Sequence, residues 1–214
     1  MDFVSAVGTI RRPITLAAVG LCAVACSGGS GSTPAAPPAS TAPAGAGATA
    51  STTPAATETP PPGDIPDTTV YVAYRPASGQ YRVKVPEGWA RTTSPAGISF
   101  TDKLNAITIK TSRAAAPTMA TARTAEVPVI QRSAHGFVLA GLSTVSRPAG
   151  TAVLIRYSAD SQPDPVTGKV YKDTIERYEF YRNGTEAVVT LAGPAGADNV
   201  DPWRTVTNSF RWLR

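Results

Sequence analysis

The sequence predicts an α+β domain, an antiparallel sheet of about six to eight strands with a middle helix and a C-terminal helix packed on it. Three observations lead to this class. Several segments alternate apolar and polar residues with the period of two of a half-buried strand. An Asn-Gly pair separates two such segments, which is typical of a hairpin. The last segment repeats apolar residues at spacings of three and four, as an amphipathic helix does.

The first strands are predicted from three short stretches. YRVKV, residues 81–85, alternates apolar and basic side chains and runs into a Pro-Glu-Gly turn. GISFTD, residues 97–102, and AITIKTS, residues 106–112, follow it. We expect these two to pair as neighbouring strands, because only a short polar connection around Lys103 separates them.

The middle of the chain predicts a helix. Residues 117–134 are rich in alanine, with Arg123 and Glu126 on what would be the solvated face. Pro128 must end, kink or begin a helix, because it has no N–H and its ring clashes with the preceding turn. His135 follows, just before a glycine. We interpret it as a helix-capping or exposed residue in preference to a catalytic or ligand-binding one, because a cation suits a helix C-terminus.

Strand patterns return in residues 137–147 and 150–158. The clearest local signal is IERYEFYRNGTEAVVTLAGP, residues 175–194, in which Asn183-Gly184 separates two strand-like runs. Asn and Gly both tolerate a positive φ, so this pair predicts a type I′ hairpin turn.

The final segment, residues 197–213, predicts the C-terminal helix. Asp201 is the expected N-cap and Pro202 the first helical residue, because proline is favoured at that position. One apolar face would pack on the sheet. Its expected members are Trp203, Val206, Phe210 and Leu213.

The order of these motifs resembles the PsbP-like fold. The likeness rests on YRVKVPEGW near the start, a following FTD, a long meander and the closing DPWRTVTNSFR. That family includes the extrinsic P protein of photosystem II and the LpqN-type lipoproteins of actinobacteria. The resemblance covers nearly all of residues 67–214 and implies the same fold and a role in docking onto larger protein assemblies. It supplies no active-site motif.

Residues 1–25 predict a signal peptide. A basic region ending in Arg11-Arg12 precedes thirteen uncharged residues, 13–25. A bilayer-spanning helix needs about 20 apolar residues, so this run has the length of a secretory signal. The export route, general secretory or twin-arginine, is left open by these residues.

The cleavage region resembles the lipobox of bacterial lipoproteins, because Cys26 directly follows Ala23-Val24-Ala25. Ala23 stands where that family most often has leucine. The resemblance implies that Cys26 receives a diacylglyceryl group and becomes the first residue. A secreted protein cut after Ala25 is the alternative, but it would begin with an exposed free thiol. Cys22 fits less well, because bulky Leu21 precedes it.

The domain organisation follows from composition. Residues 26–66 hold the expected lipidated Cys26 and a linker of Pro, Ala, Ser and Gly, with nine prolines and no aromatic side chain. Such a segment cannot bury enough apolar surface to order itself. Residues 67–214 contain 14 of the 15 aromatic side chains and are expected to fold as one PsbP-like domain.

Charge argues against nucleic acid as a partner. Residues 67–214 contain 18 Lys or Arg and 12 Asp or Glu, all scattered singly. A nucleic-acid-binding protein concentrates its basic side chains on one face. The sequence also indicates no cofactor, and we expect a monomer.

Candidate chemistry is sparse. His135 is the only histidine, and the G-x-S-x-G motif of elbow-type serine hydrolases is absent. Glu176 and Glu179 would point to opposite faces of a strand and cannot act as a pair. Asp160 and Asp164 lie in a polar loop without the spacing of a calcium motif, so we expect no metal there.

The segment around residues 160–173 is longer than a hairpin needs, and long ordered loops on a rigid sheet often carry recognition. An aromatic string follows it. Tyr178 and Phe180 should share one face of a strand, and Tyr181 should lie on the other. We interpret these aromatic side chains as part of the packing of the sheet in preference to a platform for sugar or lipid. The members of this string are Tyr171, Tyr178, Phe180 and Tyr181.

Together these observations predict a lipid-anchored lipoprotein on the extracytoplasmic face of the cell membrane, with its domain in the cell-wall space. The domain is expected to be a non-enzymatic binding or adaptor module for an envelope protein. The alternative is a carrier of a small apolar or glycolipid ligand, and a hydrolase of envelope polymers is the third hypothesis. A flat patch around the 160–173 loop would favour the adaptor. A deep apolar cavity would favour the carrier, and a pocket with two acids of raised pKa would favour the hydrolase.

Overall fold

The computed structural model describes residues 62–95 and 97–213, so the predicted signal peptide, Cys26 and most of the linker lie outside the described residues. The strands are β1 (Tyr71–Tyr74), β2 (Tyr81–Pro86), β3 (Ala90–Ser94), β4 (Gly97–Asp102), β5 (Asn105–Arg113), β6 (Val138–Arg147), β7 (Gly150–Asp160), β8 (Lys172–Arg182), β9 (Thr185–Pro194) and β10 (Arg211–Trp212). They form two antiparallel sheets. The large sheet has the order β3-β4-β5-β9-β8-β7-β6, and the small sheet has the order β1-β2-β10.

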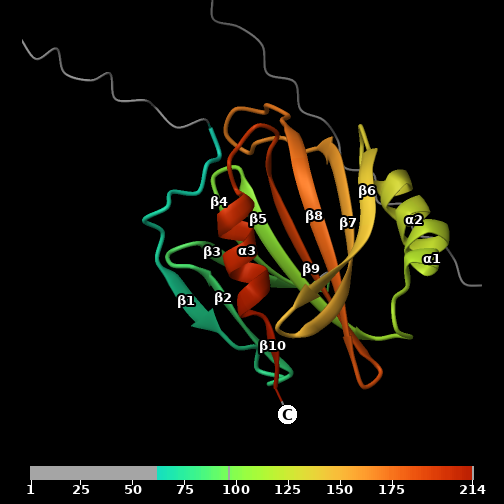
Figure 1. Ribbon diagram of the computed structural model, residues 1–214. Helices are drawn as coiled ribbons and strands as arrows, with labels where there is room; N and C mark the ends of the chain where they lie inside the picture. Colours follow the sequence, from blue (N-terminus) through green and yellow to red (C-terminus); the bar gives the residue numbers. More distant parts are fainter. Residues whose placement is uncertain (1–61, 96, 214) are drawn as a thin grey trace, which may run out of the picture. The chain divides into compact units, whose positions relative to one another are not determined.

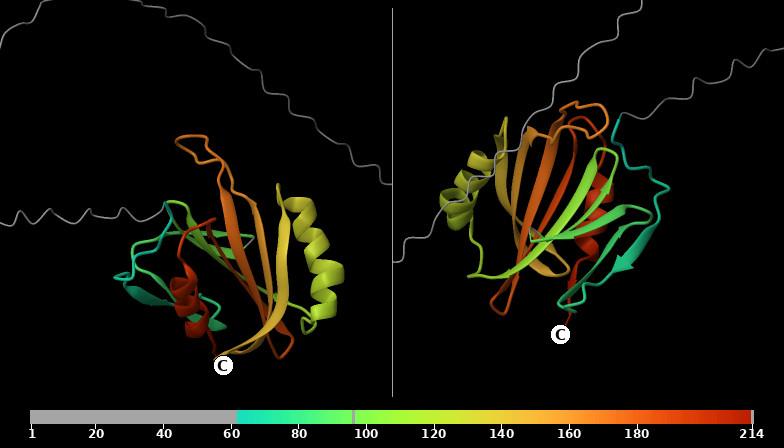
Figure 2. Two further views of the ribbon diagram at one scale, coloured as in Figure 1. Left: turned by 45° about the horizontal axis from the view of Figure 1, so that its top comes forward. Right: turned by 180° about the vertical axis from the view of Figure 1, so that it is seen from behind.

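The predicted α+β class is confirmed, with seven strands in the large sheet and a helix from the middle and the end of the chain. Helix α3 (Val200–Ser209) and the small sheet cover one face of the large sheet, and the middle helix covers part of the other face (Figures 1 and 2). The larger core lies on the α3 side and includes Ile107, Phe180, Val206 and Phe210. A smaller core under the middle helix includes Ala122, Ile130 and Ile155.

The hairpin predicted at Asn183-Gly184 is confirmed. β8 and β9 pair from Asp173↔Pro194 to Arg182↔Thr185. Asn183 has φ 50° and Gly184 has φ 78°, the left-handed values that a type I′ turn needs at both positions. The predicted pairing of β4 with β5 is also confirmed.

The middle helix continues through Pro128. It comprises α1 (Met119–Thr121), a π-helical turn η1 (Ala122–Glu126) and α2 (Val127–Ser133). The Val127 N–H reaches back to the Ala122 carbonyl, the wider spacing of a π turn. The π turn ends at Glu126, two residues before Pro128, whose ring would clash with the carbonyl of the preceding turn in a regular α-helix.

The C-terminal helix begins earlier than predicted, with Asn199 as the N-cap in place of Asp201. The Asn199 carbonyl already accepts a hydrogen bond from Trp203 N–H at 2.9 Å. Pro202 is the third helical residue, where its missing N–H is still tolerated. The helix ends at Ser209, so Leu213 lies beyond β10 and not on the helical face.

Residues 62–66, which the sequence placed in the linker, pack on the domain. Ile65 is a buried core residue, and its N–H donates to Asn199 Oδ1 at 2.9 Å. The side chains of Asn105 and Asn199 both donate to the Gly63 carbonyl, at 2.8 and 3.0 Å. The packed part of the chain therefore reaches at least from Gly63. Among the described residues, no helix has the length and apolar character needed to cross a bilayer.

Candidate functional site

The β7–β8 loop, residues 161–171, is the most prominent excursion from the large sheet (Figures 1 and 2). Its two ends are joined by the Ser161 N–H, which donates to the Tyr171 carbonyl at 2.8 Å. Tyr171 N–H returns a hydrogen bond to Ser161 Oγ at 3.0 Å. An ion pair between Lys172 and Asp160 closes the base of the loop. The loop is therefore held by hydrogen bonds between its two ends and by the ion pair at its base.

A turn inside the loop is organised by Asp164. Its Oδ1 accepts hydrogen bonds from Val166 N–H at 3.0 Å and from Thr167 N–H at 2.7 Å. The hydrogen bonds from Thr167 hold the pKa of Asp164 below its ordinary value. Asp160 is bound to Lys172 instead, so Asp160 and Asp164 have separate structural roles.

The loop presents two apolar side chains to solvent. Val166 is 91% exposed and Val170 is 54% exposed. Both valines thus lie exposed on a loop that hydrogen bonds hold in place. We name Val166 and Val170 the loop valines.

The base of the loop is fixed to its neighbours. Asp160 N–H donates to the His135 carbonyl at 2.8 Å, and Lys172 Nζ donates to the Gly136 carbonyl at 3.3 Å. Ala195 N–H, in the β9–α3 connection, donates to the Lys172 carbonyl at 2.7 Å. The His135 side chain is exposed, which agrees with the surface position predicted for it.

The described N-terminal residues lie at the same end of the domain as the loop. Asp198, also in the β9–α3 connection, donates its N–H to Asp64 Oδ1 at 2.9 Å. The view of Figure 1 and the view from behind in Figure 2 both place the start of the described chain and the β7–β8 loop at this end. The segment that follows the linker therefore enters the fold beside the loop.

An acidic cleft of about 870 Å³ opens where the chain enters. Trp89 and Ile65 contribute apolar surface, and Lys103 is its one cation among the described residues. Charged and apolar side chains both line this cleft, which is the largest of the three described and is not the purely apolar cavity expected of a lipid carrier. Its carboxylates are those of Asp64, Asp67, Glu87, Asp102 and Asp198.

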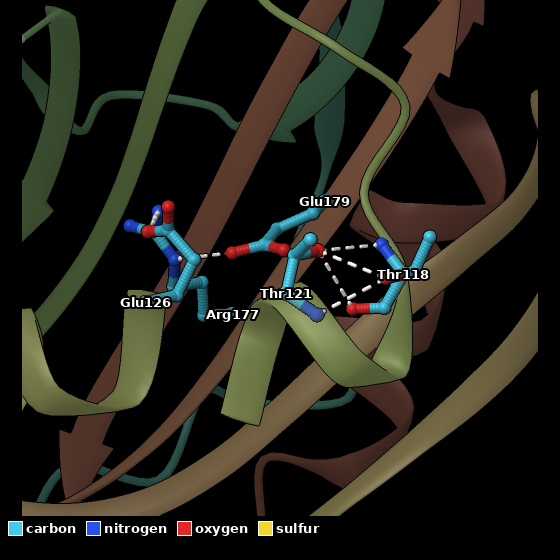
Figure 3. A network of polar contacts seen from close by, with 5 residues as sticks. All are labelled: Thr118, Thr121, Glu126, Arg177 and Glu179. Carbon is cyan, nitrogen blue, oxygen red and sulfur yellow. Dashed lines mark hydrogen bonds and ion pairs between the residues drawn. The ribbon is translucent and has the colours of Figure 1, made fainter. Parts of the chain in front are cut away.

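A polar network on the other face of the large sheet was not predicted. Arg177 Nη2 lies 3.0 Å from Glu126 Oε2, and Arg177 Nε lies 3.0 Å from Glu179 Oε1 (Figure 3). Glu126 therefore faces β8 and is not simply solvated, as its helical position suggested. The pairing joins residues 51 positions apart, so no local sequence pattern could indicate it.

Glu179 is fully buried, and its Oε2 has no hydrogen-bond partner among the described residues. Burial raises the pKa of Glu179, and the hydrogen bond and charge of Arg177 oppose this. Burial also raises the pKa of Glu186, and it raises the pKa of Asp173 to about 6. These three carboxyls line none of the three clefts described.

Glu176 and Glu179 point to opposite faces of β8, as predicted. Glu176 Oε2 accepts a hydrogen bond from the Tyr178 hydroxyl at 2.7 Å, on the α3 side. Tyr178 and Phe180 stack there with ring centroids 6.2 Å apart, inside the larger core. Tyr181 lies on the opposite face, and its hydroxyl accepts from Gly184 N–H at 3.0 Å. The aromatic string is therefore mostly sheet packing.

The part of the chain that the structure describes contains no group of three or more His, Cys, Asp or Glu side chains that could hold a metal ion. The five carboxylates of the acidic cleft therefore do not form such a group, and together they can attract a cationic surface.

No protein-family model matches the chain, and no curated protein matches it. Similar solved structures include cyanobacterial PsbP (CyanoP) of Synechocystis, with 15% identity over 72% of this chain and 99% of that chain and a TM-score of 0.48. The Ran-binding protein Mog1p of Saccharomyces cerevisiae has 9% identity over 67% and 96%, with a TM-score of 0.47. LpqN of Mycobacterium tuberculosis, involved in cell envelope biogenesis, has 16% identity over 69% and 93%, with a TM-score of 0.40.

The TM-scores of all three structures are below 0.5 and the identities are at most 16%, so membership of the PsbP-like family stays a hypothesis for this chain.

Proposed function

We propose that this protein is a lipid-anchored adaptor of the cell envelope, held to the membrane through Cys26, whose domain binds a protein partner without catalysing a reaction. The observation that carries the proposal is the exposure of Val166, 91%, at the tip of an internally hydrogen-bonded loop. A rigid apolar tip can bind a partner with little loss of conformational entropy.

The surroundings of the loop define the kind of partner. The acidic cleft opens at the same end of the domain, and the described residues supply it with five carboxylates and one lysine. The chain as a whole has a formal charge of +5, so this acidic end is a local feature. A protein surface with an apolar centre and a basic rim would match the loop valines and the cleft together.

Site-specific photo-crosslinking tests this proposal. Val166 is replaced by p-benzoyl-phenylalanine in the full-length protein in its native host, and Val129 is replaced in the same way as the matched control. Val129 is a 52% exposed valine on α2, outside the loop. We expect a discrete covalent adduct with one protein at position 166 and none at position 129. The charge reversal Asp102→Lys in the acidic cleft should lower the adduct yield several-fold, because it weakens the attraction of a basic rim.

Two results would overturn the adaptor proposal. The first is an adduct pattern that is identical at positions 166 and 129, which would reflect general proximity. The second is an adduct at position 166 whose yield is unchanged by Val170→Asp, because that substitution places a charge in the proposed apolar contact.

The anchor is tested separately. Cys26→Ala should move the protein from the membrane fraction to the soluble fraction, because the thiol that would carry the diacylglyceryl group is lost. Cys22→Ala is the matched control and should leave the protein in the membrane fraction. Membrane retention of the Cys26→Ala protein would refute lipid anchoring at this position and would leave the crosslinking result intact.

A further inference from the structure

A second cleft, which we name the basic cleft, lies between the small sheet and the C-terminal half of α3. Its volume is about 500 Å³. In Figure 1 this end of α3 points away from the β7–β8 loop, toward the C-terminus. The basic cleft is therefore separate from the acidic cleft and the loop valines. Its lining residues are Ala73, Arg82, Val83, Lys84, Thr205, Asn208, Ser209 and Arg211.

Three cations line the basic cleft, those of Arg82, Lys84 and Arg211, and no carboxylate of the described residues does. The ion pairs within residues 62–95 and 97–213 use other cations, those of Lys172, Arg177 and Arg204. The positive charges of the basic cleft thus have no protein counter-ion in the described part of the chain.

The strand pattern forces these charges together. β2 alternates, with Tyr81, Val83 and Val85 buried in the core and the basic residues between them exposed. Arg82 stands directly opposite Arg211 in the pairing of β2 with β10. Like charges in this position destabilise a sheet. A destabilising pair of like charges is expected at a position where function requires both charges.

The contacts of α3 compensate only part of the positive charge of these three side chains. Arg211 Nη1 donates to the Asn208 and Phe210 carbonyls at 2.6 and 2.7 Å, so it caps the end of the helix. The helix C-terminus contributes about half a negative charge, which leaves roughly +2.5 from the three side chains. Arg82 and Lys84 have no side-chain hydrogen bond within the described residues.

Hydroxyl and amide groups complete the lining. The Lys84 N–H donates to Ser209 Oγ at 2.7 Å, which fixes β2 against α3 and sets the width of the basic cleft. Thr205 and Asn208 add an O–H and an N–H₂ donor from the exposed side of the helix. The basic cleft therefore offers positive charge and hydrogen-bond donors with no competing carboxylate.

We propose that the basic cleft binds a phosphate group. Guanidinium groups match the geometry of phosphate oxygens with paired hydrogen bonds, and the lysine adds a point charge. A bound phosphate would also relieve the repulsion between Arg82 and Arg211. The same chemistry serves a soluble phosphate ester and the headgroup of an anionic phospholipid, and the test below distinguishes these two sources.

The test compares two variants that lose the same charge. Arg82→Gln/Lys84→Gln alters the basic cleft, and Lys110→Gln/Arg156→Gln removes two exposed cations from the large sheet. Both are made in the full chain with Cys26→Ala, so that a lipid anchor does not contribute to binding. Affinity is measured by calorimetry for glycerol 3-phosphate and by co-sedimentation for vesicles of phosphatidylglycerol, with phosphatidylcholine vesicles as the uncharged reference.

We expect the cleft variant to bind at least ten-fold more weakly and the matched control to change less than two-fold. Saturable binding of glycerol 3-phosphate with this loss identifies a soluble source. Binding to phosphatidylglycerol vesicles alone, with the same loss, identifies a lipid headgroup. Equal weakening of both variants would overturn the proposal, because it would show attraction by net charge only. Failure of the parent protein to bind either probe at millimolar concentration would also overturn it.

Discussion

Arg177 and Glu179 stand two residues apart on one face of β8, and Arg177 Nε donates to Glu179 Oε1 at 3.0 Å. The Glu179 side chain is fully buried, whereas the Arg177 side chain is 22% exposed and also pairs with Glu126. One cation thus compensates a buried acid whose second oxygen, Oε2, has no partner in the described part of the chain. We therefore expect this pair to add little net stability, because the desolvation cost of the buried carboxylate offsets its attraction to Arg177.

Removing the cation should therefore destabilise the domain. We expect Arg177→Met to lower the free energy of unfolding by about 3 kcal/mol at pH 7.5, because it leaves an unpaired buried carboxylate. Urea denaturation followed by circular dichroism measures this. The loss should shrink at pH 5, because burial raises the pKa of Glu179 and protonation of the folded state removes the uncompensated charge.

The double variant Arg177→Met/Glu179→Leu is the control. Replacing both partners with apolar side chains should restore most of the lost stability, since no buried charge remains. If the double variant were as unstable as Arg177→Met, the loss would come from packing around Arg177 and the charge argument would be wrong.

The titration of Asp173 should appear as a separate pH dependence. Burial raises the pKa of Asp173 from its ordinary value of 3.8 to about 6. The folded state then binds the proton more tightly than the unfolded state, so the free energy of unfolding should fall as the pH rises from about 4 to about 6. The loss is on the order of 1 kcal/mol, because the half-buried carboxyl is still partly screened by solvent.

Urea denaturation from pH 4 to pH 7 compares the natural protein with Asp173→Asn. Glu179 and Glu186 also have pKa values raised by burial, so they contribute a slope of the same sign in both proteins. The difference between the two curves isolates Asp173. Parallel curves across this interval would contradict the assignment.

The features predictable from the sequence were those encoded within a few residues. The alternation in β2 and β8 and the Asn183-Gly184 turn were sufficient to place their elements. The small sheet was not predictable, because β10 is only two residues long and forms by pairing with β2 from the other end of the chain. The basic cleft depends on that pairing, so neither Arg82 nor Arg211 carried a local signal of a site.

The start of α3 was missed for a similar reason. Asp201-Pro202 has the local signature of a helix start, but Asn199 is held by long-range contacts to residues 63, 65 and 105. Tertiary hydrogen bonds thus moved the helix boundary by two residues. The loop valines could be suspected only from loop length, since their exposure depends on the turn around Asp164.

The contacts of Asn199 lead to a further prediction. Asn199 is buried, accepts from Ile65 N–H and donates to Gly63 O and Asn105 Oδ1. We expect Asn199→Ala to lower the free energy of unfolding by about 2 to 3 kcal/mol, because it leaves buried polar groups without partners. Thermal denaturation measures the effect, and Asn208→Ala, an exposed position on the same helix, is the control and should change little.

Gly193 gives an independent check of the same cluster. A Cβ at this position would lie 2.5 Å from Asn105 Oδ1 and 2.8 Å from Asn199 Nδ2. Gly193→Ala should therefore displace the two amides and destabilise the protein by an amount similar to Asn199→Ala, about 2 kcal/mol. Combining Gly193→Ala with Asn199→Ala should cost less than the sum, because both act on one network. Strict additivity would show that the amides do not work together.

The last prediction concerns Gly136, which links the stability of the loop base to partner binding. Gly136 has φ +61°, and a Cβ there would lie 2.5 Å from both Asp160 Oδ2 and Lys172 Nζ. Gly136→Ala should thus add backbone strain of about 1 kcal/mol and separate an exposed ion pair worth at most about 1 kcal/mol. Gly184 has φ +78° with no atom within 4 Å of an added Cβ, so Gly184→Ala supplies the strain alone. If the loop base positions the loop valines, Gly136→Ala should lower the crosslinking yield at position 166 and Gly184→Ala should not. Equal yields in the two variants would mean that the loop keeps its shape without the Asp160–Lys172 pair.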